Sequence, residues 1–275
     1  MKKIKSIIAL SLIAVMVFAI AGCSCSSSSS STTTTSTTVV KNDDSTLVVG
    51  FDAEFPPYGF KDEKGNYTGF DLELAEAVAN IIGMKVAYQP IDWDAKDAEL
   101  NSGTIDCIWN GFTINGRENQ YAWSEPYLNN EQVVVVKADS QINTNADLAG
   151  KTVEVQKESS AETALNSGNG AALKQTFGNL VTVADYNTAL MDLESGAVDA
   201  VIMDSGVAEY KINSEKKSFR LLKEPIATEQ YGVGFAKENT ALRDKVNDAL
   251  HQLAANGGME QISTKWFGSN IVIIK

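Results

Sequence analysis

Hydrophobic residues recur along the chain with the spacings of alternating strands and helices. Between 71 and 82 the apolar positions follow one face of a helix, and Gly83 marks its end. Those positions are Leu72, Ala75, Val78, Ala79 and Ile82. Short apolar runs on either side, 46–50 and 85–89, are typical of buried strands.

The same alternation continues through most of the chain. We expect further strands at 104–109, 151–155, 181–184 and 197–203. We expect further helices at 93–101, from Ser159 onward, and at 188–194, 240–256 and 259–266. This order predicts an α/β fold with mostly parallel sheets, in which ligands bind beyond the carboxyl ends of the strands.

One sequence frame occurs twice. Residues 100–106 and 193–199 both read Leu-x-Ser-Gly-x-(Ile/Val)-Asp and are followed by an apolar run. Each copy predicts a helix end, a glycine cap and a buried strand. The first strand leads to a loop with Arg117, and the second ends on Asp204. Opposite charges at the ends of two similar half-domains predict a cleft that binds a zwitterion.

The first 44 residues differ from the rest. Three lysines precede the apolar run 7–20, which is short for a membrane span and has the layout of a secretory signal. The run ends Ile20-Ala-Gly-Cys23, which resembles a bacterial lipoprotein signal and implies cleavage before Cys23 and lipidation of that residue. The alternative is an ordinary signal peptide with a chance cysteine. We therefore predict a signal peptide at 1–22 and a lipidated, Ser/Thr-rich tether at 23–44.

The net charge and the cysteines limit the classes of partner and the covalent links that this chain can have. The net charge is −12, and removal of the three lysines of the signal makes it −15. An acidic body without a basic cluster argues against nucleic acid and against an anionic membrane surface as partners. Cys23 is assigned to lipid, Cys25 to the tether and Cys107 to a strand, so we expect no structural disulfide.

The loop after the first strand is rich in acids and aromatic rings. Asp52 and Glu54 favour a cationic or amide group, and Phe55 or Tyr58 offers a ring for its alkyl part. Alternatively, these rings belong to the local hydrophobic core. We expect Phe60 to be part of that core and Phe55 to contact the ligand.

Two loops supply groups for an anion. Arg117 has the planar fork that matches a carboxylate, Gly111 allows close backbone approach, and Thr113 adds a hydroxyl. Ser159-x-x-Glu162 is a capping-box pattern, and the N–H groups of a helix start bind anions. A solvated arginine and a plain helix cap are the alternatives.

Asp204 needs a partner because it emerges from a buried strand, and either a ligand ammonium or a nearby lysine would serve.

The sequence contains few residues or motifs that are typical of enzymes. His251 is the single histidine and lies in a predicted amphipathic helix. The sequence has no Cys/His metal spacing, no glycine-rich phosphate loop and no Gly-x-Ser-x-Gly motif. We predict a protein that is not an enzyme and that binds neither metal nor cofactor.

Several motifs together resemble the solute-binding proteins of polar amino-acid ABC importers, the bacterial extracellular solute-binding protein family 3. They are Gly50-Phe-Asp-Ala-Glu-Phe-Pro-Pro-Tyr58, Gly69-Phe-Asp-Leu-Glu-Leu-Ala75, Gly103-Thr-Ile-Asp106, Gly111-Phe-Thr-Ile114 with Arg117, Trp123-Ser-Glu-Pro-Tyr127, Ser195-Gly-Ala-Val-Asp199, Asp204 and Tyr231-Gly-Val-Gly-Phe235. The resemblance implies a two-lobed periplasmic-binding-protein-like fold (type II). Lobe 1 would comprise 45–130 and 229–275, and lobe 2 would comprise 131–228. Two hinge strands, near 129–133 and 228–233, would join them.

The resemblance also implies roles for single positions. Arg117 would bind the α-carboxylate with Thr113 and the helix start at Ser159 and Ser160. Asp204 would bind the α-ammonium with the backbone of Gly111. Phe55 would stack on the ligand. The positions expected to face the ligand side chain are Asp52, Trp93 and Gln156.

The chain departs from the family pattern at Glu158, where glycine is frequent, and we predict that this side chain points to solvent. The turn before Arg117 is one residue shorter than usual, and Ala161 replaces a polar residue of some relatives.

We therefore expect a monomeric, lipid-anchored extracytoplasmic protein that captures a polar or cationic L-amino acid and delivers it to an ABC permease in the membrane. Cystine or a neutral polar amino acid stays open as the ligand. The rival hypotheses are an enzyme on the same fold, similar to cyclohexadienyl dehydratase with Glu54 as its acid, and a sensory or adhesive lipoprotein.

Overall fold

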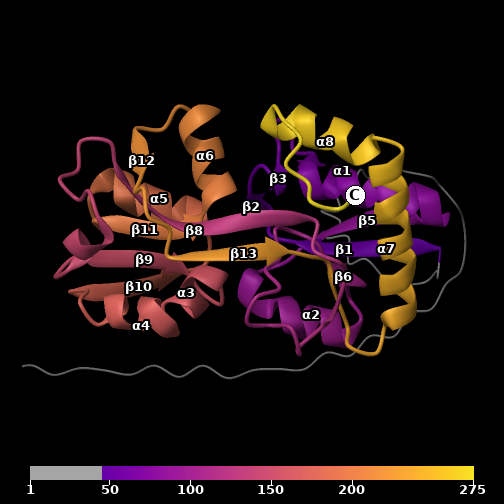
Figure 1. The fold of residues 1–275 in the computed structure, drawn as a ribbon, viewed down its shortest axis with the longest axis horizontal. Coiled ribbons are helices and arrows are strands. Elements are labelled where there is room, and N and C mark those ends of the chain that lie inside the picture. Colours follow the sequence, from indigo (N-terminus) through magenta and orange to yellow (C-terminus); the bar gives the residue numbers. More distant parts are fainter. Residues whose placement is uncertain (1–44) are drawn as a thin grey trace, which may run out of the picture. The chain divides into compact units, whose positions relative to one another are not determined.

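The computed structural model describes residues 45–275 (Figure 1). The predicted signal, the lipidation site Cys23 and the tether lie outside these residues. A search of the described part for a helix long and apolar enough to cross a membrane finds none.

The first sheet has five strands in the order β5-β1-β6-β14-β7. They are β1 (Thr46–Phe51), β5 (Lys85–Pro90), β6 (Cys107–Ile108), β7 (Ala122–Trp123) and β14 (Gly234–Phe235). Strands β5 and β6 run parallel to β1, whereas β14 is antiparallel to both of its neighbours. The helices of this lobe are α1 (Phe70–Ile82), α2 (Lys96–Ser102), α7 (Thr240–Ala255) and α8 (Gly258–Phe267). A small antiparallel sheet is added by β2 (Glu54–Phe55), β3 (Gly59–Lys61) and β4 (Tyr67–Thr68).

The second sheet has the order β10-β9-β11-β8-β12, with β13 paired to β8. Its strands are β8 (Leu128–Lys137), β9 (Thr152–Gln156), β10 (Asn179–Val183), β11 (Ala200–Asp204), β12 (Phe219–Leu221) and β13 (Ala227–Tyr231). Strands β9, β10 and β11 are parallel, and β8 is antiparallel to its neighbours. The helices are α3 (Ser160–Ala164), α4 (Gly168–Lys174), α5 (Tyr186–Ser195) and α6 (Ser205–Asn213).

Strands β8 and β13 run side by side from one sheet to the other (Figure 1). They pair antiparallel, with Asn130 opposite Glu229. Both fall where the sequence predicts the hinges. The lobe boundaries at 130/131 and 228/229 stay our proposal, and this strand pair supports them.

The duplicated frame has the same structure in both lobes. Gly103 and Gly196 end α2 and α5 in the left-handed conformation, with φ of 75° and 83°. The aspartate three residues after each glycine accepts a hydrogen bond from the neighbouring parallel strand, β1 in the first sheet and β9 in the second. Asp106 Oδ2 lies 2.9 Å from Val48 N, and Asp199 Oδ2 lies 2.9 Å from Thr152 N. The repeat therefore encodes the same turn from helix to strand twice.

The sequence-based elements differ from the structure in a few places. The expected strand 104–109 shortens to Cys107–Ile108, because the backbone of Thr104 and Ile105 bonds Glu99 in the helix-ending turn. The expected helix 93–101 begins with a 3-10 turn at Trp93–Ala95. The sequence interpretation missed β2, β3, β4, β7, β12, β14, α4 and α6.

Candidate functional site

Nine of the ten positions nominated from the sequence line one small cavity between the lobes, with a volume of only about 10 Å³ in this closed form. They are Phe55, Trp93, Gly111, Thr113, Arg117, Gln156, Ser159, Ser160 and Asp204. The tenth, Asp52, contacts this group through Gln156, whose Nε2 donates to Asp52 Oδ2 at 2.8 Å. Their roles toward a ligand stay predictions, but the structure brings them together.

Arg117 is a buried cation, 7% exposed, in the turn after β6. Its guanidinium donates to the backbone oxygens of Thr113 (3.3 Å) and Glu158 (3.0 Å) and lies 5.4 Å above the Phe112 ring. Among residues 45–275, no carboxylate forms an ion pair with it. A guanidinium has five N–H donors, so this one keeps donors for an anion in the cavity.

Asp204 ends β11 on the other lobe and is 3% exposed. Three donors converge on its Oδ1: Asn130 Nδ2 at 2.8 Å, Gln132 Nε2 at 2.9 Å and the Tyr231 hydroxyl at 2.5 Å. No lysine or arginine of the described residues ion-pairs with it, so the alternative of a lysine partner fails. Burial, followed by the nearby charge of Glu229, raises the pKa of Asp204 to about 8.

Glu229 is a second buried carboxylate that the sequence interpretation missed. It is 6% exposed and lies on β13. Its Oε1 accepts hydrogen bonds from Asn130 (2.7 Å), Gln132 (2.9 Å) and Thr113 (2.9 Å). The Thr113 hydroxyl was expected to help hold a carboxylate, but its single proton is directed to Glu229 here.

Gly111 is positioned by a buried acid from α1. Its N–H donates to Asp71 Oδ2 at 2.5 Å, and the Tyr127 hydroxyl donates to the other oxygen at 2.9 Å. Burial raises the pKa of Asp71 to about 7. The φ of Gly111 is 55°, and an added Cβ would lie 2.8 Å from Phe55 Cε1. The position therefore requires glycine for both conformation and space.

The helix start at Ser159 is formed as predicted. The Ser159 hydroxyl accepts from the backbone N–H of Glu162 at 3.1 Å. Glu158 is exposed, as predicted, with a φ of 58° in the left-handed region where glycine is favoured. Its carbonyl, and not its carboxylate, faces Arg117. Helix α3 is only five residues long, so local N–H groups and not a long helix dipole would assist an anion.

Polar contacts cross between the lobes beside the cavity. Besides Gln156–Asp52, Lys157 Nζ lies 2.7 Å from Asp94 Oδ2, and Asn187 donates to Glu54. The Lys157–Asp94 pair is half exposed and contributes little on its own. The Arg117 contact with the Glu158 carbonyl also joins the lobes. The lobes are therefore closed on each other in this structure.

A second groove, of about 680 Å³, adjoins the cavity at Trp93, which lines both. Six carboxylates line it: Asp52, Glu54, Asp92, Asp94, Glu99 and Asp185. Burial raises the pKa of Asp52 to about 6. The approach to the cavity on this side therefore carries negative potential.

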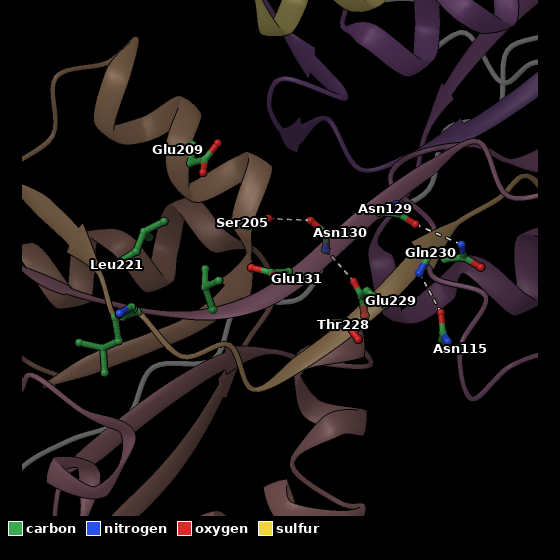
Figure 2. Close-up of a pocket in the computed structure, with 13 residues that line it drawn as sticks. Asn115, Asn129, Asn130, Glu131, Ser205, Glu209, Leu221, Thr228, Glu229 and Gln230 are labelled. Atoms are coloured by element: carbon green, nitrogen blue, oxygen red, sulfur yellow. Dashed lines mark hydrogen bonds between the residues drawn. The ribbon is translucent and has the colours of Figure 1, made fainter. Parts of the chain in front are cut away.

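A larger groove of about 820 Å³ lies beside β8 and β13 (Figure 2). Asn130 and Glu229 line it, but Arg117 does not. We take the smaller cavity as the candidate site because only that cavity joins a buried cation on one lobe to a buried carboxylate on the other.

Groups for enzyme chemistry lie away from the cavity. Glu54 is exposed and accepts from Asn187. His251 is on the surface near Glu125, and Cys107 is fully buried in β6. Within residues 45–275 no cluster of His, Cys, Asp or Glu is arranged to hold a metal.

Comparison with known proteins gives consistent matches. The profile of the bacterial extracellular solute-binding proteins, family 3, matches residues 47–269. The L-cystine-binding protein TcyJ of Escherichia coli (strain K12) is 31% identical over 229 residues, which cover 82% of this chain and 84% of TcyJ. A substrate-binding protein of an ABC uptake transporter from Streptococcus pneumoniae, solved with bound histidine, is 38% identical with a TM-score of 0.80, covering 83% of this chain and 94% of that one. The ancestral amino acid-binding protein AncCDT-1, a precursor of cyclohexadienyl dehydratase, is 31% identical with a TM-score of 0.73, covering 81% and 96%.

Proposed function

We propose that this chain, which belongs to the bacterial extracellular solute-binding proteins of family 3, captures an L-amino acid by closing its two lobes and presents it to an ABC permease. One observation carries the proposal. The cavity joins a buried arginine on lobe 1 to a buried aspartate on lobe 2, and among the described residues neither has an ion-pair partner. An α-amino acid brings the two charges that these side chains lack.

The same two charges explain why the two lobes would close on the ligand. Arg117 would hold the α-carboxylate with the N–H groups at Ser159 and Ser160, and Asp204 would hold the α-ammonium. Only the closed form lets one ligand contact both residues, so the ligand stabilises that form over an open one. A buried charge left unpaired is costly, so compounds that lack either α-group should bind far more weakly.

The side-chain end of the cavity favours a polar or cationic ligand. Asp52 lies behind Gln156, and the adjoining groove is lined by carboxylates. Phe55 and Trp93 provide apolar contact for an alkyl chain. TcyJ is named for L-cystine and the Streptococcus protein holds histidine, so both ligands belong in any screen.

Binding without catalysis is the better-supported role. The rival, a dehydratase of the same fold, needs a general acid in the cavity, and Glu54 is directed to Asn187 outside it. This rival needs an experimental test because AncCDT-1, which resembles this chain, is a precursor of a dehydratase. Dehydration of a cyclohexadienyl carboxylate by the protein would support the rival.

We further propose that the protein works outside the cytoplasm as a monomer, anchored through lipid on Cys23 and separated from the membrane by the tether. Cys23→Ser should move the protein from the membrane fraction to the soluble fraction while amino-acid binding is unchanged. Retention of the variant in the membrane would contradict the anchor.

A thermal-shift screen against the twenty amino acids and cystine tests the function. A ligand present at 100 times its dissociation constant adds about 2.7 kcal/mol, which is roughly 5–10 °C for a body of this size. Arg117→Ala should lose the shift while its melting temperature without ligand changes little. If no amino acid stabilises the wild-type protein, the proposed function is wrong.

A further inference from the structure

Two buried carboxyl groups, and not one, lie at the end of the cavity assigned to the ligand ammonium. Asn130 Nδ2 donates to both Asp204 Oδ1 (2.8 Å) and Glu229 Oε1 (2.7 Å). Gln132 Nε2 also donates to both, at 2.9 Å each. The Asp204 carboxyl group lies within hydrogen-bonding reach of that of Glu229. Two ionised carboxylates so close in a buried place repel each other strongly.

Strand register holds this pair together. Gln132 lies opposite Asp204 in the β8–β11 pairing, and Asn130 lies opposite Glu229 in the β8–β13 pairing. Figure 2 shows Asn130 between Ser205 and Glu229, and the Ser205 hydroxyl donates to Asn130 Oδ1 at 3.1 Å. This bond turns the Asn130 amide nitrogen toward the carboxyl groups. Asn130, Gln132, Asp204 and Glu229 all lie on strands β8, β11 and β13 of the second sheet, and β8 and β13 are the two strands that connect the lobes.

No cation of the described residues is close enough to the pair to let both groups ionise. Tyr58, Tyr186 and Tyr231 face the pair, and burial keeps the pKa of each well above its usual value. Asp52 also raises the pKa of Tyr186 and Asp71 that of Tyr58, so lobe 1 adds further carboxylates beside these rings, and Arg117 lines the same cavity as Asp204. Glu131 and Glu209 lie on the outer groove of Figure 2. Within residues 45–275 no lysine or arginine ion-pairs with Asp204 or Glu229.

We propose that Asp204 and Glu229 form a two-carboxylate site that shares one proton in the ligand-free protein and exchanges it for the ammonium of the amino acid. This inference rests on the proposed function, because it assigns the ammonium to the Asp204 end of the cavity. Three donors already occupy Asp204 Oδ1, so Oδ2 is the atom that holds either the shared proton or the ammonium. The proton leaves to solvent as the ammonium arrives.

The exchange leaves the buried charge unchanged. One proton on two carboxyl groups gives a net charge of −1. Two carboxylates with one ammonium also give −1. Because the charge is the same before and after, binding adds no net charge to a buried site, where an extra charge is costly. The raised pKa of Asp204, about 8, places the exchange in the neutral range.

Calorimetric titration in buffers of different ionisation enthalpy measures the exchange directly. The probe is the amino acid with the largest thermal shift, with L-arginine as first choice because its own groups do not titrate between pH 6 and 7. The wild-type protein should release close to one proton per ligand, and its dissociation constant should fall roughly tenfold from pH 6 to pH 7. Glu229→Gln should release clearly less proton and lose part of that pH dependence, because it removes the second cause of the raised pKa of Asp204 and leaves burial, the larger one.

Glu209→Gln is the matched control, since Glu209 is a neighbouring glutamate outside the cavity, and it should behave as the wild type does. If Glu229→Gln fails to fold, Asp52→Asn and Asp71→Asn, made separately, decide whether the proton comes from another raised carboxyl group near the cavity, whatever they do to affinity. Release that survives in both variants supports the pair, and release lost in either one overturns the assignment. Tight binding with no proton release by the wild type, or equal release by Glu229→Gln, also overturns it while leaving amino-acid capture intact. Absence of binding at every pH instead refutes the proposed function.

Discussion

Gly206→Ala should block closure without harming the folded lobes. Gly206 lies in the first turn of α6 on lobe 2, and Tyr58 belongs to lobe 1. A Cβ added at Gly206 would lie 2.2 Å from the Tyr58 hydroxyl oxygen, whereas ordinary contact begins at 3.4 Å. The two lobes would therefore have to stay roughly 1.2 Å further apart at this point, or Tyr58 would have to move.

Tyr58 has no room to move. It is 1% exposed, and its ring packs against Phe55, Phe70, Tyr231 and Phe267. Overpacking of this kind costs about 1–3 kcal/mol, which corresponds to about 5- to 150-fold weaker binding. In an open form the new methyl group meets no clash, and alanine suits a helix better than glycine by up to about 1 kcal/mol. Stability without ligand should therefore be unchanged or slightly higher.

Calorimetry and denaturant unfolding of the same variant separate the two effects. Adding Tyr58→Phe to Gly206→Ala removes the closest atom and leaves ring carbons at 3.0 and 3.2 Å, so the double variant should recover at least half of the lost binding free energy. Tyr58→Phe alone removes one hydroxyl contact with Tyr231 and should weaken binding no more than about tenfold. Wild-type affinity in Gly206→Ala would show that binding does not require this closed contact, and the mechanism would fail with it.

Three further substitutions test separate parts of the molecule. Arg117→Lys should weaken binding at least about tenfold in calorimetry, because an ammonium cannot replace a bidentate fork; equal affinity would remove the arginine from the carboxylate site. Asp52→Asn should reduce the preference for L-arginine over L-glutamine by about tenfold in competition binding, and an unchanged ratio would contradict a side-chain role. Glu154 is buried, and neither of its side-chain oxygens has a hydrogen-bond partner in the described part of the chain. Glu154→Met should therefore stabilise lobe 2 in urea unfolding, by about 1–3 kcal/mol at pH 8 and by less at pH 5. Equal stabilisation at both pH values would refute the charge argument.

The sign of the Glu154 effect follows from its titration. Burial raises the pKa of Glu154 to about 7, above its value in the unfolded chain. The folded protein therefore binds more protons than the unfolded one between about pH 4.5 and 7, and stability falls as the pH rises through that range. Methionine at this position does not titrate, so its advantage is largest above pH 7.

The sequence by itself determined the local features of this protein. Helical periodicity predicts α1 and α7, the glycines at 103 and 196 end their helices, and the Ser159 pattern caps α3, because each depends on residues a few positions apart. Most of the nominated cavity residues follow from the same logic, since loops after parallel strands meet at one edge of a sheet, whereas Trp93, Gln156 and Ser160 were nominated through the resemblance to family 3.

The tertiary structure alone decided which distant groups meet. Glu229 joins Asp204 only through the register of β8 with β11 and β13, and Asp71 reaches Gly111 across 40 positions. The approach of Tyr58 to Gly206 requires both lobes to be in place. No local pattern marks such residues, because their neighbours are set by pairing between segments far apart in the chain. The sequence could therefore nominate the charges of the cavity, but the second carboxylate and the closing contact become visible only in the fold.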